Sequence, residues 1–111
     1  MELKRHASLN WDDASVSFAA LGSEARLQVL RTLVRAGPEG LPVADIQSRT
    51  GIPASTLTHH LKFLAAAGVV TQEKIGRSII SRAAFSHLED LAHFLLCECC
   101  ADDHQRAANH G

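Results

Sequence analysis

The chain has 111 residues, of which 46% are hydrophobic and 21% charged, and its formal net charge is -1. A chain of this length folds as one domain with a small core and is too short for an enzyme built from two domains. Its apolar fraction excludes a disordered chain, and its apolar runs are too short to cross a bilayer. We expect one domain in residues 1–100 and a polar, mobile tail in residues 101–111.

Cysteine usage and the N-terminus indicate the compartment. The three cysteines all lie within Cys97–Cys100, so they make no framework of disulfides that closes long loops. The first residues are charged, but no apolar run follows them and no secretory signal is predicted. We expect a cytoplasmic protein with no membrane partner.

Charge is distributed unevenly along the chain. Residues 26–82 carry eight Lys or Arg against three acids, a balance of +5, whereas residues 1–25 sum to -2 and residues 83–111 to -4. A basic segment between acidic flanks is typical of a nucleic-acid-binding module, although a solvated charged face gives the same balance.

Apolar residues spaced three and four apart predict four helices in the first part of the chain, over residues 12–21, 24–36, 42–50 and 54–67. Ser23 is expected to cap the second helix, and Gly37-Pro38 to end it. Only Gly51-Ile-Pro53 separates the last two helices, and two short helices joined by a tight turn with glycine form a helix-turn-helix.

The period then changes from helix to strand. Val69–Thr71 and Ile79–Ser81 are rich in β-branched residues, and the segment Lys74–Arg77 between them places Gly76 at the tip of a β-hairpin. A last helix follows over residues 85–95. The predicted fold is mainly α with a small β-hairpin, a winged helix-turn-helix of order ααααββα.

The helix over residues 54–67 has two unlike sides. Leu57, Leu61 and Leu64 form a buried stripe, and the opposite side carries short polar groups and one cation: Ser55, Thr56, Thr58, His59 and Lys62. Such side chains fit a major groove and reach base edges or phosphates, so we expect them to contact double-stranded DNA. The alternative is a generic polar surface.

Two further sets of residues bear on DNA binding. Lys74, Arg77 and Arg82 suit phosphate or minor-groove contacts, unless they are simple solubilising charges. His59 and His60 are neighbours whose side chains point about 100° apart on a helix, which disfavours a shared metal ion. We expect His59 to contact DNA and His60 to pack at the edge of the core.

The segment Ser55-Thr-Leu-Thr-His-His-Leu61 and its continuation to Val70 resemble the recognition helix and first wing strand of the ArsR family of winged-helix repressors, and Phe18-Ala-Ala-Leu-Gly-Ser-Glu-Ala-Arg26 resembles the family's opening segment. The resemblance covers roughly residues 15–100. It implies a homodimer that sits on operator DNA and leaves when an inducer binds. We expect Val16 and Phe18 of the first helix, and Leu88, Leu91 and Leu95 of the last, to form the dimer interface.

The resemblance also locates possible sensor sites. The thiolate pair that arsenic-sensing members carry in the third helix has no counterpart in Leu41-Pro-Val-Ala-Asp45, and the zinc-sensing pattern of the last helix has none near Ser81-Arg-Ala83. Cys97, Cys99 and Cys100 remain, and some arsenic-sensing relatives carry an adjacent Cys pair at this place.

Three thiols in four residues suit arsenic(III), which three sulfurs bind, and also antimony(III) or another soft ion. On a regular helix Cys97 and Cys99 point about 160° apart, so a site of three sulfurs requires the helix to unwind there. The alternative is three small apolar residues at a dimer seam.

A thiol-based redox sensor of the same fold is the competing function for this cluster. Reactive thiolates are favoured by helix N-termini and nearby cations, whereas these cysteines follow a helix and have Glu98, Asp102 and Asp103 around them. We therefore favour ion sensing. No pattern typical of a thiol oxidoreductase or a zinc hydrolase is found, and we expect no enzyme.

Overall fold

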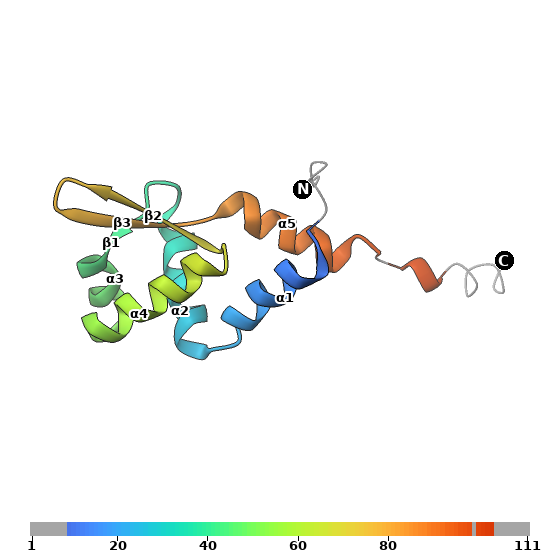
Figure 1. The fold of residues 1–111 in the computed structure, drawn as a ribbon, viewed down its shortest axis with the longest axis horizontal. Helices are drawn as coiled ribbons and strands as arrows, with labels where there is room; N and C mark the ends of the chain where they lie inside the picture. The colour runs from blue at the N-terminus through green and yellow to red at the C-terminus, as the bar shows by residue number, and fades with distance from the viewer. Residues whose placement is uncertain (1–8, 99, 104–111) are drawn as a thin grey trace.

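The structure is a computed structural model that describes residues 9–98 and 100–103. Within these residues five helices and three strands follow in the order α1, α2, β1, α3, α4, β2, β3 and α5 (Figure 1), and a 3-10 turn, η1 (Ala101–Asp103), comes last. The predicted fold class is confirmed, with one strand more than expected.

The first two helices begin at side-chain caps. The Asn10 side chain accepts a hydrogen bond from the Asp13 amide (2.7 Å), and α1 (Trp11–Ala20) starts one residue before the predicted position. The Ser23 hydroxyl accepts from the Arg26 amide (3.3 Å) at the start of α2 (Glu24–Ala36), as predicted. Gly37, with φ of 82°, ends α2 in a conformation that favours glycine.

The helix-turn-helix consists of α3 (Val43–Thr50) and α4 (Ala54–Ala66). Gly51 caps α3 in the left-handed region, at φ of 75°, and donates to the Gln47 carbonyl (2.8 Å). Pro53 precedes α4, where a proline suits a helix start.

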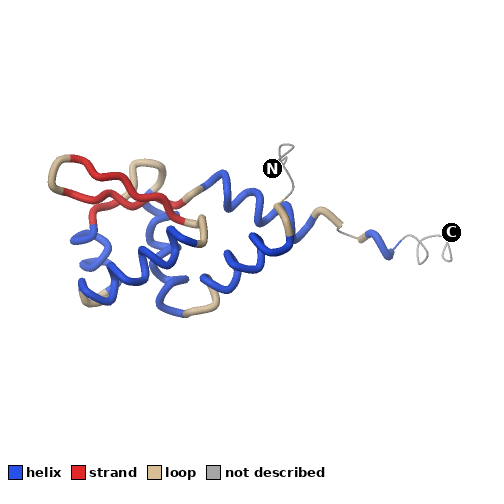
Figure 2. Tube along the Cα trace, in the orientation of Figure 1, coloured by secondary structure: helices blue, strands red, loops and turns tan. Residues whose placement is uncertain are grey.

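The wing is the β-hairpin of β2 (Val70–Ile75) and β3 (Ser78–Ala83). Both strands are longer than predicted: Lys74 lies within β2, opposite Ile79, and only Gly76 and Arg77 form the turn. A third strand, β1 (Leu41–Pro42), pairs antiparallel with β3 and gives the sheet order β1-β3-β2 (Figure 2).

Gly40, directly before β1, is in a position that only glycine fits. Its φ is 72°, and a Cβ there would lie 2.4 Å from the Ser81 carbonyl oxygen and 2.6 Å from Arg82 Cγ. The backbone of this residue can therefore approach β3 closely enough for β1 to pair with it.

The remaining helix, α5 (Phe85–Leu96), lies beside α1 at the end of the molecule away from α3 and the wing tip (Figure 1). The core runs between these ends and takes buried side chains from every helix, among them Ala14, Leu33, Ile46, Leu61 and Leu91. None of the helices in the described residues is both long and apolar enough to span a lipid bilayer.

One buried hydroxyl joins three elements. Ser17 of α1 donates to the Ala67 carbonyl at the end of α4 (2.8 Å), and its oxygen lies 2.8 Å from His87 Nε2 of α5. A hydroxyl has a single hydrogen, so the Ser17 oxygen accepts the second bond and His87 carries a hydrogen on Nε2. The end of the recognition helix is thereby tied to both α1 and α5.

Candidate nucleic-acid interface and thiol cluster

The outer side of α4 is polar and open to solvent. Its three leucines, Leu57, Leu61 and Leu64, are completely buried. All five residues predicted to contact DNA from this helix are exposed: Ser55, Thr56, Thr58, His59 and Lys62. The Thr58 hydroxyl donates to the Ala54 carbonyl (2.9 Å), so it offers an outside ligand only its oxygen as an acceptor.

The neighbouring histidines occupy different environments. His59 is exposed and His60 half-buried, and their ring centroids lie 6.3 Å apart at an interplanar angle of 53°. Nδ1 of His60 is buried and has no hydrogen-bond partner among the described residues. The two rings thus lie as the helix geometry predicts, one on the outer face and one at the edge of the core.

Of the three basic side chains of the wing, two are unpaired within the described residues and one forms an ion pair. Lys74 and Arg77 are exposed, and neither forms an ion pair with the described part of the chain. Arg82, by contrast, pairs with Glu73 (2.8 Å) and donates to the Pro38 carbonyl (3.1 Å). Its guanidinium links β3 to β2 and to the turn before β1, and a DNA contact of Arg82 stays a prediction.

A groove brings the wing and the helix-turn-helix together. Its lining comes from the start of α3 (Pro42, Val43 and Ala44), from α4 (Thr58) and from the wing (Arg77, Ser78 and Ile79). The sequence predicts DNA contacts for both Thr58 and Arg77, but it does not predict that they line one groove, because 19 positions separate them. A DNA backbone that lies along α4 would meet Arg77 on the wing side of this groove.

Arg26 of α2 makes contacts to α1 and α4. Its guanidinium lies over the Phe63 ring, 4.3 Å from the centroid, and its Nε donates to the Ala20 carbonyl (2.6 Å). These contacts cover part of an exposed aromatic ring of α4 and close the turn between α1 and α2.

The thiol cluster begins where α5 ends. The Cys97 amide donates to the His93 carbonyl (2.7 Å) as the last turn closes, and its thiol donates to the Phe94 carbonyl (3.5 Å). Cys100 has φ of 64°, outside the helical region, and both thiols are exposed. The helix therefore does not continue through the cluster, as a site of three sulfurs requires.

Cys99, the remaining predicted ligand, lies outside the described residues, as does the tail after Asp103. Within residues 9–98 and 100–103, no three His, Cys, Asp or Glu side chains are close enough to hold a metal ion. Cys97 and Cys100 are the members of the cluster whose positions are described. The tail residues Ala101–Asp103 form the 3-10 turn η1.

The α1–α5 end carries an apolar surface formed by Trp11, Val16, Leu95 and Leu96, which are 53–74% exposed. Trp11 packs edge-on against Phe94, with centroids 5.4 Å apart. Of the other residues predicted for the interface, Leu91 is buried within the chain (4% exposed), and Phe18 and Leu88 are half-buried against the core. We call Trp11, Val16, Leu95 and Leu96 the α1–α5 apolar surface.

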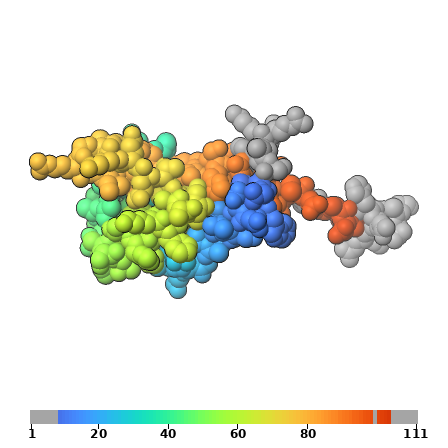
Figure 3. Space-filling view, viewed as in Figure 1, coloured from blue at the N-terminus to red at the C-terminus, as the bar shows by residue number. Residues whose placement is uncertain are grey.

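The wing tip and the turn η1 lie at opposite ends of the described part of the chain (Figure 3). A helix-turn-helix with an exposed polar second helix and a basic hairpin beside it defines a winged helix-turn-helix protein of the DNA-binding class.

Comparison with known proteins agrees with this class. Residues 21–73 match the profile of a family described as "Helix-turn-helix domain". The chain is 36% identical over 72 residues to the HTH-type transcriptional regulator NmtR of Mycobacterium tuberculosis, an alignment that covers 65% of this chain and 58% of NmtR. The chain thus spans little more than half the length of that relative.

Two solved structures are similar over most of the chain. An ArsR-like transcriptional regulator from Rhodococcus sp. RHA1 superposes with a TM-score of 0.72 at 28% identity, covering 89% of this chain and 90% of that one. The homodimeric winged helix-turn-helix DNA-binding domain of a possible ArsR-family regulator from Mycobacterium bovis gives 0.62 at 27% identity, covering 86% and 84%. In sequence and fold the chain is therefore similar to winged helix-turn-helix transcriptional regulators, ArsR-like ones among them.

Proposed function

We propose that this chain is a DNA-binding transcriptional repressor, not an enzyme, that acts in the cytoplasm and leaves its operator when arsenic(III) binds the thiol cluster. The observation that carries DNA binding is the outer face of α4, with its exposed polar side chains, beside a groove that ends at Arg77. Ser55 and His59 are assigned to base edges, and Lys62, Lys74 and Arg77 to phosphates.

The repressor is proposed to act as a homodimer. The α1–α5 apolar surface supports this, because a second copy that covers these four exposed side chains removes them from water. An operator with two-fold symmetry needs two recognition helices about one turn of DNA apart, so the interface sets their spacing. The homodimeric winged helix-turn-helix domain from M. bovis supports the same arrangement.

Arsenic(III) is the proposed inducer, with antimony(III) as the nearest chemical substitute. The proposal is supported by three cysteines within four residues and by a chain that leaves the helical conformation at this place. Thiolates that gather around one ion would reshape the chain directly after Leu96, which belongs to the α1–α5 apolar surface. A coupling of about 1–3 kcal/mol, or roughly 5–150-fold in operator affinity, is sufficient for induction.

The exposure of Cys97 and Cys100 also supports the redox alternative, because oxidants reach exposed thiols. One titration separates the two functions: operator binding is measured with arsenite, antimonite, zinc, cadmium and peroxide in parallel. Release by arsenite in the presence of a reductant supports ion sensing. Release by peroxide alone would support the redox sensor instead.

The thiol assignment is tested with Cys97→Ser, Cys99→Ser and Cys100→Ser in the same assay. We expect Cys99→Ser and Cys100→Ser to lose arsenite release most strongly, with Ser86→Ala, an exposed change on α5, as the control. If all three variants dissociate at the native arsenite concentration, the sensor is not this cluster. If none binds the operator even without arsenite, the thiols serve the fold.

A further inference from the structure

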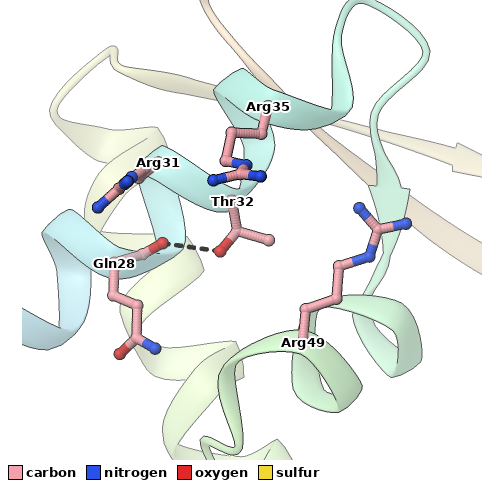
Figure 4. Close-up of a pocket in the computed structure, with 5 residues that line it drawn as sticks. All are labelled: Gln28, Arg31, Thr32, Arg35 and Arg49. Atoms are coloured by element: carbon pink, nitrogen blue, oxygen red, sulfur yellow. Dashed lines mark hydrogen bonds between the residues drawn. The ribbon is translucent and has the colours of Figure 1, made fainter.

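A hollow between α2 and α3 gathers three arginines. Its lining consists of four residues of α2 and one of α3: Gln28, Arg31, Thr32, Arg35 and Arg49. Its volume is about 350 Å³. Figure 4 shows the three arginines around Gln28 and Thr32, with Arg31 and Arg49 on opposite sides and Arg35 between them. We call it the α2–α3 arginine hollow.

The three guanidinium groups have no counter-charge. Within the described residues, Arg31, Arg35 and Arg49 form neither a hydrogen bond nor an ion pair with the protein. Other arginines of the chain behave differently: Arg82 pairs with Glu73, and Arg26 lies over Phe63. Three like charges around one hollow repel one another, so an anion placed between them would be attracted by all three.

The other two lining residues already donate hydrogen bonds, Thr32 within α2 and Gln28 to α3. The Thr32 hydroxyl donates to the Gln28 carbonyl (2.9 Å), a bond drawn in Figure 4. The Gln28 side-chain amide donates to the Thr50 carbonyl (3.5 Å) at the end of α3. The groups left for a ligand are therefore guanidinium donors, whose planar forks match the oxygens of a phosphate group.

The hollow is lined by other elements than the recognition surface. On α2 its residues lie opposite Val29, Leu30 and Leu33, which face the core, and α4 turns its buried leucines toward that same core. None of the residues that line the hollow belongs to α4 or to the wing, so the residues assigned to DNA do not include its three arginines. The volume is in the range of small-molecule sites.

We propose that the α2–α3 arginine hollow binds a small phosphorylated anion, at a site separate from the operator and from the thiols. The anion bridges Arg31 and Arg35 of α2 with Arg49 of α3. Because α3 is the first helix of the helix-turn-helix, binding also holds this helix to the body of the protein.

The probe is inorganic pyrophosphate, titrated into the full chain by calorimetry at constant ionic strength. We expect the double variant Arg31→Ala/Arg35→Ala to bind it at least tenfold more weakly than the native chain. Lys74→Ala/Arg77→Ala removes the same charge from the wing and serves as the matched control, with binding unchanged. Arg31→Lys/Arg35→Lys keeps the charge without the planar fork and should fall in between.

A second readout localises the ligand. Amide resonances around Gln28, Thr32 and Thr50 should shift on addition of pyrophosphate, and those of Lys74–Arg77 should not. These shifts are read on the native chain, so they test the site even where a double variant folds poorly.

Several results would overturn the proposal. They are no binding at millimolar pyrophosphate, equal weakening by the wing variant, and equal affinity for sulfate and chloride at the same ionic strength. A hollow that binds a short DNA duplex of random sequence but not pyrophosphate would be a second DNA contact instead.

Discussion

The helices α4 and α5 are of similar length, 13 and 12 residues, yet they use their surfaces in opposite ways. In α4 the leucines face inward and are completely buried, and the outer side is polar apart from Phe63, which Arg26 covers in part. In α5 only Leu91 is buried, and Leu95 and Leu96 remain 64% and 59% exposed.

This difference shows what each helix meets outside the chain. A polar outer side loses little by staying in water and can exchange its water for DNA phosphates and base edges. Exposed apolar side chains are stabilised only when a second apolar surface removes them from water. The stabilisation is about 25 cal/mol per Å² of apolar surface that is buried. One helix therefore suits a nucleic acid and the other a protein, and four changes test that division.

The largest effect is expected on the inner side of α4. Leu61→Ala leaves a cavity in the core and should lower the free energy of unfolding by about 2–5 kcal/mol, measured by urea denaturation. Leu95→Ala, measured at a protein concentration where the chain is monomeric, should change it by less than about 0.5 kcal/mol. Equal losses would mean that α5 is as deeply packed as α4.

Ser17→Ala tests the junction of the two helices. The change leaves the Ala67 carbonyl and His87 Nε2–H unpaired at a buried position, so the free energy of unfolding should fall by about 1–3 kcal/mol. Ser15→Ala, an exposed change on the same helix, is the control. An indistinguishable pair of urea midpoints would show that the junction contributes nothing to stability.

Leu95→Glu tests the apolar side of α5. A charge in the proposed interface should weaken the dimer at least tenfold, or about 1.4 kcal/mol, as measured by sedimentation equilibrium. Leu27→Glu places the same charge on α2, where the leucine is 51% exposed, and should leave the dimer unchanged. Leu91 is unsuitable for this test because it is buried within the chain. A native dimer constant for Leu95→Glu would refute the assignment.

Lys62→Ala tests the outer side of α4 and has the smallest expected effect. Loss of one phosphate contact should reduce the slope of log affinity against log salt by about one unit and weaken all DNA sequences alike. Arg77→Ala should behave in the same way if the wing also contacts DNA. Gln72→Ala on β2 removes an exposed side chain without changing the charge and should leave the slope as it is.

Local sequence patterns predicted most of the fold. The leucine spacing of α4, the Ser23 cap and the glycine ends of helices depend on neighbours in the sequence, and each is found in the structure. The strand β1 could not be predicted in this way, because a strand of two residues shows no periodicity. Its partner β3 also lies about 40 positions later in the sequence.

The site was predictable where it depended on one helix. Every α4 residue assigned to DNA is exposed, because the buried stripe determines the opposite side. The partners of Arg26 and Arg82 lie in other elements, and no spacing identifies them. Periodicity likewise places Leu91 and Leu95 on related sides of one helix, but it does not distinguish a side covered by its own chain from a side covered by a second copy.

The short strand β1 makes the wing and the helix-turn-helix one mechanical unit. Its two residues lead directly into α3 and are hydrogen-bonded to β3, so a displacement of the hairpin pulls on the start of α3. The absent side chain of Gly40 permits this attachment, since a methyl group there would meet the Ser81 carbonyl. In hydrogen exchange, the amides of β3 and α3 should open together rather than as separate segments. The wing would then move together with the helix-turn-helix, in addition to placing positive charge beside it.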